Sequence, residues 1–224
     1  GIVACLEIGQ TMIQAVLWDF GGVITASPFE AFNRFEAANG LPKDLIRSIN
    51  ATDPETNAWA QLESSRISVD EFDARFADEA RSHGHEVSGS QVLDLLSGDL
   101  REEMVSALKI IKSRLKIGCI TNNVNTGEGP SMTRDPSRVA RMNEVMALFD
   151  IVIESSKAGI RKPDPEIYKL ACSQMDIEPA EAVFLDDLGV NLKPARKLGM
   201  TTIKVLTAKQ ALDDLETELG FGLR

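Results

Sequence analysis

The sequence predicts an α/β fold: a mostly parallel β-sheet sandwiched by helices, with a helical segment inserted after the first strand. Three observations lead to this prediction. A short apolar run ends at Asp19 and has the length of a buried strand. Residues 29–99 then show helical periodicity without a strand signal. From residue 100 onward, apolar strands alternate with amphipathic helices, as in βαβ units with right-handed crossovers.

Composition limits the partners that the chain is expected to bind. Its 224 residues include 43% hydrophobic side chains, which is enough for one large domain or a domain with a small insert. The formal net charge of −10 disfavours nucleic acid and anionic membranes, because both require basic surfaces. No apolar run is long enough to span a membrane. Three widely spaced cysteines indicate neither a disulfide framework nor a metal motif, so a cytoplasmic location is expected.

The pattern divides the chain into a core, an insert and an extension. The first strand is expected within MIQAVLWD, residues 12–19. Residues 12–28 and 100–224 together should form the core, and residues 29–99 should form the helical insert. Residues 1–11 are interpreted as an N-terminal extension, because they precede the first strand and lack the basic head of a signal peptide.

Helices in the insert are predicted from periodicity and capping signals. Segments 29–40 and 68–84 carry phenylalanines at helical spacing, and 88–98 should form a shorter helix. Ser68, with Glu71 three residues later, forms a capping box that starts the second of these helices. The insert holds more than half of the nine phenylalanines, and we expect them to pack its helices together. They are Phe29, Phe32, Phe35, Phe72 and Phe76.

The remaining elements follow in alternation. Strands are predicted at 116–121, 150–155, 182–187 and 201–206. Helices are predicted at 101–114, 165–175, 191–199 and 209–219. Residues 123–141 contain two glycines and two prolines, and are expected to form a long polar loop that leads into a helix.

Carboxylates follow two of the predicted strands. Asp19 ends the first strand, and Asp186 and Asp187 end the strand at 182–187. In a parallel sheet these ends lie at one edge, where open α/β folds bind ligands. Clustered carboxylates repel one another unless a cation holds them, and oxygen ligands without histidine or cysteine suit Mg²⁺. A single aspartate at a strand end is more often a turn or cap residue, but three are harder to explain in that way.

Thr121 and Lys162 supply two further polar groups. Thr121 ends another strand, where its hydroxyl could hold phosphate oxygens, although threonine is also a common helix cap. Lys162 begins KPDP, where two prolines stiffen the loop. A lysine near carboxylates could neutralise both them and a transferring phosphoryl group, whereas the alternative is an ordinary surface lysine. Together with an aspartate that can attack phosphorus, the set indicates phosphoryl-transfer chemistry.

Four short motifs, in this order, resemble the haloacid dehalogenase (HAD) superfamily: DFGGV, IT, Lys162 in KPDP, and LDD. The resemblance covers the chain from Met12 onward. It implies a Rossmann-like HAD core with a small helical cap inserted after the first strand. The stretches KPDPEIYKLA and VFLDDLGVNLKPARKLGMTTI are most similar to the phosphatase domain at the amino end of soluble epoxide hydrolase and to related cytosolic phosphatases.

The resemblance implies a role for each matching residue. The implied catalytic groups are the nucleophile Asp19, the phosphoryl-binding Thr121, and Lys162 as the bridge between nucleophile and phosphate. The implied Mg²⁺ ligands are Asp19, the backbone carbonyl of Gly21, Asp187 and, as a ligand or supporting group, Asp186. The implied substrate-binding positions are Gly21, Gly22, Asn122 and Asn191, of which Asn191 would support the acidic loop or the site.

One position departs from the phosphatase pattern. Phosphatases of the superfamily carry a second aspartate two residues after the nucleophile, as general acid and base, and this chain has Gly21 there. The expected function is Mg²⁺-dependent hydrolysis of a small phosphomonoester, such as a sugar phosphate or similar metabolite, through an aspartyl-phosphate. Two alternatives remain: a 2-haloacid dehalogenase, which lacks that aspartate and needs no metal, and a non-catalytic phosphate-binding relative. No sequence signal indicates an oligomeric state.

Overall fold

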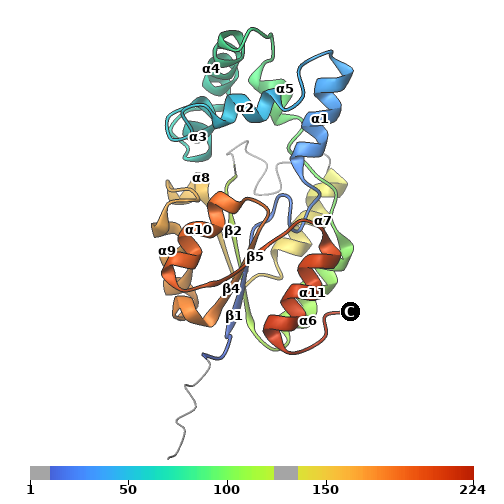
Figure 1. Ribbon diagram of the computed structural model, residues 1–224, viewed down its shortest axis with the longest axis vertical. Coiled ribbons are helices and arrows are strands. Elements are labelled where there is room, and N and C mark those ends of the chain that lie inside the picture. Colours follow the sequence, from blue (N-terminus) through green and yellow to red (C-terminus); the bar gives the residue numbers. More distant parts are fainter. Residues whose placement is uncertain (1–10, 124–135) are drawn as a thin grey trace, which may run out of the picture.

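A computed structural model describes residues 11–123 and 136–224, which contain a five-stranded sheet (Figure 1). All neighbouring strands run parallel, in the order β3-β2-β1-β4-β5. Because β1 is the central strand, Asp19 lies at the middle of one edge of the sheet. The predicted fold class is confirmed. The strands are β1 (Ala15–Trp18), β2 (Lys116–Thr121), β3 (Ile151–Glu154), β4 (Ala182–Asp186) and β5 (Thr201–Lys204).

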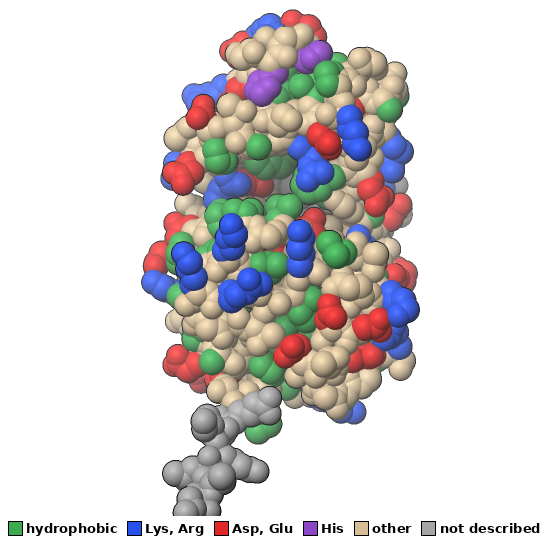
Figure 2. Space-filling view, viewed as in Figure 1, with side chains coloured by type: hydrophobic (Ala, Val, Ile, Leu, Met, Phe, Trp, Pro, Cys, Tyr) green, Lys and Arg blue, Asp and Glu red, His purple; other side chains and the backbone are tan. Residues whose placement is uncertain are grey.

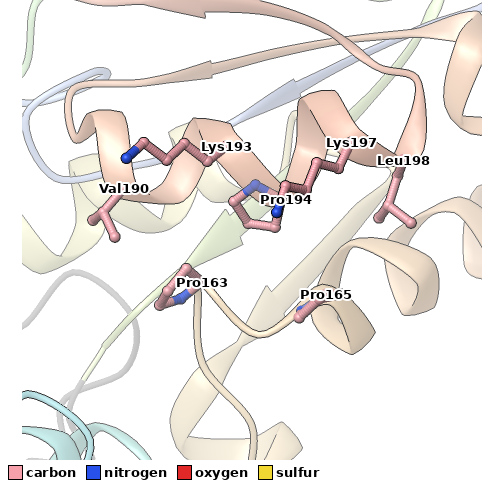
Figure 3. Close-up of a pocket in the computed structure, with 7 residues that line it drawn as sticks. All are labelled: Pro163, Pro165, Val190, Lys193, Pro194, Lys197 and Leu198. Atoms are coloured by element: carbon pink, nitrogen blue, oxygen red, sulfur yellow. The ribbon is translucent and has the colours of Figure 1, made fainter.

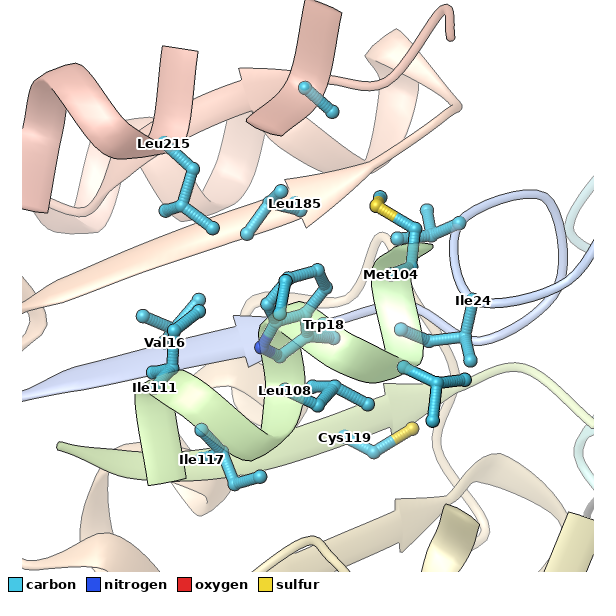
Figure 4. Packing of buried hydrophobic residues seen from close by; sticks show 14 of the residues in the cluster. Val16, Trp18, Ile24, Met104, Leu108, Ile111, Ile117, Cys119, Leu185 and Leu215 are labelled. Atoms are coloured by element: carbon cyan, nitrogen blue, oxygen red, sulfur yellow. The ribbon is translucent and has the colours of Figure 1, made fainter. Parts of the chain in front are cut away.

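Helices cover both faces of the sheet, which explains why its central strands are apolar between their end residues. In β1, Val16 and Trp18 face one helical layer, and Ala15 and Leu17 face the other, as the two-residue period of a strand requires. The first layer packs around Trp18 (Figure 4). It consists of α6 (Glu102–Lys112), α7 (Pro136–Met146) and α11 (Ala208–Leu219), and the second consists of α9 (Pro165–Met175) and α10 (Gly189–Leu198).

The helices between β1 and α6 form a cap above the carboxyl ends of the strands (Figure 1). The cap has a hydrophobic core of its own. As predicted, all five phenylalanines of the insert lie in this core or pack against it. The capping box of Ser68 and Glu71 is present at the start of α4. The cap helices are α1 (Pro28–Ala38), α2 (Leu45–Ala51), α3 (Ala58–Glu63), α4 (Val69–Ser82) and α5 (Gly89–Leu93).

Two antiparallel segments connect the cap to the core. The amide of Ala26 donates to the carbonyl of Asp99 at 2.8 Å, and the amide of Arg101 donates to the carbonyl of Ile24 at 2.9 Å. An isolated antiparallel bridge lies between these two hydrogen bonds. The chain therefore leaves the core and returns to it at one place, shortly after Asp19.

Several boundaries differ from the predicted ones. β1 begins at Ala15 rather than at Met12. The stretch predicted as a loop and helix lead-in is helical from Pro136, and its residues 124–135 lie outside the described part, as do residues 1–10 of the predicted extension. Short helices were also missed, because packing stabilises them more than any local pattern does. They are α2, α3, α8 (Ser155–Ala158) and the 3₁₀ turn Pro179–Glu181.

Candidate active site

Backbone hydrogen bonds hold Asp19 at the carboxyl end of β1. Its amide donates to the carbonyl of Leu185 at 2.9 Å, which extends the pairing of β1 with β4. Its carboxylate oxygen Oδ1 accepts the amide of Phe20 at 2.7 Å and lies 2.8 Å from Nζ of Lys162. The other oxygen, Oδ2, makes no hydrogen bond or ion pair within the described residues. Asp19 is 8% exposed, so a nearly buried carboxylate keeps one oxygen available.

Lys162 links two of the three predicted carboxylates. Its Nζ lies 2.8 Å from Asp19 and 2.7 Å from Asp186, and its side chain is 1% exposed. Asn122 holds the backbone of the same lysine. The side-chain amide of Asn122 donates to the Lys162 carbonyl at 2.9 Å, and its oxygen accepts the Lys162 N–H at 2.8 Å. Asn122, predicted to bind substrate, thus uses its side chain to fix the position of Lys162.

Asp186 is fully buried and surrounded by donors. It accepts the amide of Leu188 at 2.8 Å and the side-chain amide of Asn191 at 3.0 and 3.1 Å, in addition to its contact with Lys162. The hydroxyl of Tyr168 donates to the carbonyl of Asn191 at 2.7 Å and so fixes the start of α10. Asn191 therefore supports the acidic loop through Asp186, one of the two roles that the resemblance implied.

Asp187 is only partly buried, and its carboxylate lies directly against Gly22. A Cβ atom at Gly22 would be 2.4 Å from Oδ2 of Asp187, and the φ of +83° also disfavours any other residue there. Gly21 differs, since a Cβ atom at that position would meet no heavy atom within 4 Å. Gly22 is thus needed for the close approach of Asp187, whereas Gly21 leaves space for a side chain.

Burial and like charge shift the pKa values of this cluster. Burial is the main cause that raises the pKa of Asp19 to about 8; the ion pair with Lys162 offsets only part of it, and repulsion from Asp186 and Asp187 adds to it. Burial and the charge of Asp186 raise the pKa of Asp187 to about 6. For Lys162, burial lowers the pKa, but the carboxylates of Asp186 and Asp19 outweigh it and raise the pKa above its ordinary value. The single positive charge of Lys162 therefore does not balance the negative charge of the three carboxylates.

The carboxylates have the chemistry of a magnesium site. Oxygens of Asp19, Asp186 and Asp187 all lie within 4.8 Å of one another. The set contains only oxygen donors, which hard cations such as Mg²⁺ prefer. Because Asp186 already accepts from three other groups, Asp19 and Asp187 are the less engaged carboxylates. The residues present fit a Mg²⁺ ion, whose charge would offset their mutual repulsion.

Thr121 lies at the end of β2, and its hydroxyl makes no hydrogen bond within the described residues. The residues beyond it belong to a network that the sequence did not reveal. Nδ2 of Asn123 donates to Glu154 at 2.9 Å, while Oγ of Ser155 accepts the Asn123 amide at 3.0 Å and donates to the Asn123 carbonyl at 3.1 Å. This network joins the ends of β2 and β3 and holds the backbone beside Thr121. Its sequence signal, an acid and a serine where a strand ends, is that of an ordinary turn.

Two of the hollows on the described surface differ in character. One lies between the cap and the core, with basic and acidic side chains at its margin (Figure 2). The other is a groove of about 310 Å³ on the outer side of α10, where Lys193 and Lys197 lie near Pro163 and Pro165 (Figure 3). None of the acidic cluster lines this groove, so it is separate from the acidic centre. Across the described residues, no helix combines the length and apolarity needed to cross a membrane.

The site has carboxylates at the ends of β1 and β4, a buried lysine between them and a cap above. This arrangement is typical of α/β enzymes that react at the carboxyl edge of the sheet. Comparison of sequences identifies the group. The pattern of haloacid dehalogenase-like hydrolases matches residues 13–199, so the chain belongs to that family and is a hydrolase. The resemblance seen in the four motifs is thereby confirmed.

Several known proteins are similar to this chain. Acyl-CoA dehydrogenase family member 10 and bifunctional epoxide hydrolase 2, both from Mus musculus, are each 31% identical, over 96% and 93% of this chain. The chain spans only 20% and 39% of their respective lengths. Sesquiterpene phosphatase astK of Aspergillus oryzae is 26% identical, over 94% of this chain and 98% of that protein. HAD family enzyme bt-2542 of Bacteroides thetaiotaomicron, solved with magnesium and inorganic phosphate, shares the fold: its TM-score is 0.57 at 22% identity, covering 86% of this chain and 93% of that one.

Proposed function

We propose that this protein hydrolyses a small phosphomonoester in an Mg²⁺-dependent reaction that passes through an aspartyl-phosphate on Asp19. The observation that carries the proposal is the cluster of Asp19, Asp186 and Asp187 beside Lys162, which combines a carboxylate nucleophile with a site for a divalent cation. The similarity to a sesquiterpene phosphatase over almost its whole length supports the same class of reaction. A fold relative that holds magnesium and phosphate is consistent with it. A sugar phosphate or similar metabolite is the expected substrate.

The residues of the chain supply a nucleophile and groups that would bind the phosphoryl oxygens. The unengaged Oδ2 of Asp19 would attack phosphorus, and the P–O bond to the leaving group would break as the new O–P bond forms. Lys162 would neutralise part of the charge on the phosphoryl oxygens, and the hydroxyl of Thr121 would donate to one of them. Water would then attack the same phosphorus, which releases phosphate and restores the carboxylate of Asp19, and the proton that the water loses to solvent balances the one that the departing oxygen takes up from solvent. A bound Mg²⁺ would supply further positive charge, because a single lysine does not balance the charge of three carboxylates and a phosphoryl group.

Gly21 favours a second candidate, because no side chain at that position can protonate a leaving group. A 2-haloacid dehalogenase attacks carbon, releases halide without needing a proton, and needs no metal. The test is turnover of a panel of phosphorylated metabolites and of 2-haloacids, each with Mg²⁺ and with EDTA. Phosphate release that requires Mg²⁺ supports the proposal. Halide release that is insensitive to EDTA would replace it with dehalogenation, and phosphate binding without turnover would indicate a non-catalytic relative.

Asp187→Ala is expected to weaken Mg²⁺ binding, because Asp187 is one of the two less engaged carboxylates. At a Mg²⁺ concentration about 100 times the dissociation constant, binding should stabilise the wild type by about 2.7 kcal/mol, which raises the unfolding midpoint by roughly 5–10 °C. In Asp187→Ala most of this shift should disappear in thermal unfolding measured with and without Mg²⁺. Asp78→Ala, at an exposed acid of α4, is the control and should keep the full shift. Equal shifts in all three proteins would place the ion elsewhere.

Gly21→Asp is expected to raise kcat/KM for alkyl phosphates by about 10- to 100-fold and to change aryl phosphates little, because only poor leaving groups need the proton. The position tolerates a Cβ atom, and the backbone there is not left-handed. Gly21→Asn has nearly the same shape without an acid, and it should not help alkyl phosphates. A series of substrates with graded leaving-group pKa measures the effect. A wild-type rate that is independent of leaving-group pKa would show that another residue donates the proton.

A further inference from the structure

Among the described residues, one contact between the cap and the core, besides the two connecting segments, lies where α3 meets α8. Arg161 of the core makes two contacts with the cap. Its Nη2 lies 2.7 Å from Oε2 of Glu63, the last residue of α3, and its Nη1 donates to the carbonyl of Pro54 at 3.0 Å. Close by, the hydroxyl of Ser65 donates to the carbonyl of Ser156 at 2.5 Å. A single guanidinium thus holds two segments of the cap.

The ion pair of Arg161 with Glu63 is shielded from solvent but not fully satisfied. The side chain of Glu63 is 6% exposed and that of Arg161 is 25% exposed, so solvent screens their attraction less than it screens an exposed pair. Oε2 of Glu63 and Nε of Arg161 are buried without a hydrogen-bond partner among the described residues. The 2.7 Å contact is therefore a charge attraction rather than an aligned hydrogen bond. When the two groups separate, the protein loses that attraction but few hydrogen bonds.

The core side of this contact has a rigid base. Arg161 is followed directly by Lys162, whose backbone N–H and carbonyl are both bound by the side chain of Asn122. The Lys162 side chain is held in turn by Asp19 and Asp186. Arg161 therefore projects from a segment whose position is determined by the acidic centre. The contact of the cap with Arg161 therefore fixes the position of the cap relative to Asp19.

We propose that the Arg161–Glu63 ion pair sets the position of the cap over the acidic centre, and thereby how readily a substrate is enclosed. Both are positioning residues, since Arg161 acts through the cap and Glu63 lies on it. The proposal rests on the proposed function, because enclosure matters only if the centre turns over a substrate. When only the enclosed state holds substrate, the apparent dissociation constant rises as the enclosed fraction falls. Loss of the pair therefore raises KM and leaves the rate of the enclosed complex unchanged.

The kinetic test compares wild type with Arg161→Gln, Glu63→Gln and Arg161→Lys, using p-nitrophenyl phosphate and Mg²⁺. We expect the two glutamine variants to raise KM by about three- to tenfold and to keep kcat within about twofold of wild type. Arg161→Lys keeps the positive charge and should recover most of the wild-type KM. Added salt should raise the wild-type KM more than that of either glutamine variant, because screening weakens only an intact pair.

Hydrogen exchange provides a readout that needs no turnover. The carbonyl of Pro54 lies in a turn that the amides of Thr56 and Asn57 close. When Arg161 no longer holds this turn, both amides should exchange about tenfold faster, while the interior of α4 should be unaffected. Glu63→Gln should have the same effect to a smaller degree, because Arg161 keeps its hydrogen bond to Pro54.

Arg141→Gln is the matched control, because it breaks an ion pair with Glu102 that is more exposed and lies within the core. It should change neither KM nor exchange. A fall in kcat at constant KM would overturn the proposal, since Arg161 would then act on the chemistry through Lys162. Unchanged KM and exchange in both glutamine variants would also overturn it. If wild type hydrolyses no phosphomonoester, the proposed function fails, yet faster exchange in these variants would still support cap positioning. If Arg161→Gln does not fold, the KM and the hydrogen exchange of Glu63→Gln test the proposal.

Discussion

Asp19→Asn is expected to lower the rate of phosphomonoester hydrolysis by about 10⁴- to 10⁶-fold while the protein stays folded. A neutral amide is too weak a nucleophile to form the bond to phosphorus. Its oxygen can still accept the amide of Phe20, so the turn after β1 keeps its hydrogen bond. Lys162 keeps its contact with Asp186. Above the raised pKa of Asp19, about 8, the variant also lacks one of three clustered charges. Its unfolding free energy should therefore be higher than that of wild type there, and close to it at lower pH.

The measurement is single-turnover phosphate release, with denaturant unfolding on the same samples. Deamidation of the variant would restore the aspartate, so mass spectrometry must show intact amide before the rates are compared. Asp176→Asn is the control: it makes the same chemical change at the exposed C-cap of α9, where asparagine tolerates the left-handed backbone. It should retain full activity. Hydrolysis by a verified Asp19→Asn sample within about 100-fold of wild type would remove Asp19 from the role of nucleophile.

The sheet and its acidic edge could be predicted because their signals are local. A strand covered on both faces is apolar up to its end, as β1 and β4 are, and the first acid that ends such a run must lie at the sheet edge. The parallel pairing of β1 with β4 then brings Asp19 and Asp186 together, although 166 positions separate them in the chain. The burial of Lys162 was not evident locally, because a lysine followed by proline is usually a surface loop residue.

Contacts between distant segments were beyond a sequence-based prediction. That the Asn122 side chain holds the Lys162 backbone could not be predicted, because Lys162 belongs to another loop 40 positions further along the chain. The same holds for Arg161 and Glu63, which belong to the core and the cap. α2 was missed for a related reason: it has no side-chain cap, and its N-cap residue Asp44 is left-handed. Packing against the rest of the cap, rather than local signals, stabilises it.

Lys162→Met is expected to damage both stability and activity, because this lysine is the only cation in contact with two buried carboxylates among the described residues. Removing one partner of a buried ion pair leaves uncompensated charge and costs about 3–5 kcal/mol. Loss of a charge aimed at the phosphoryl oxygens should lower kcat by about 10²- to 10³-fold. Lys169→Met, at an exposed lysine paired with Glu166, is the control and should change the unfolding free energy by less than about 1 kcal/mol.

Mg²⁺ separates the two effects of Lys162→Met. A Mg²⁺ ion at the acidic cluster would neutralise the same carboxylates as the lysine. Mg²⁺ should therefore recover part of the lost stability in urea unfolding and should stabilise the variant more than it stabilises wild type. It should not recover the rate, because an ion bound by Asp19 and Asp187 cannot also occupy the position of Nζ between Asp19 and Asp186. If Lys162→Met were as stable as wild type without Mg²⁺, the carboxylates would be neutral there, and the charge imbalance that underlies the magnesium site would be absent.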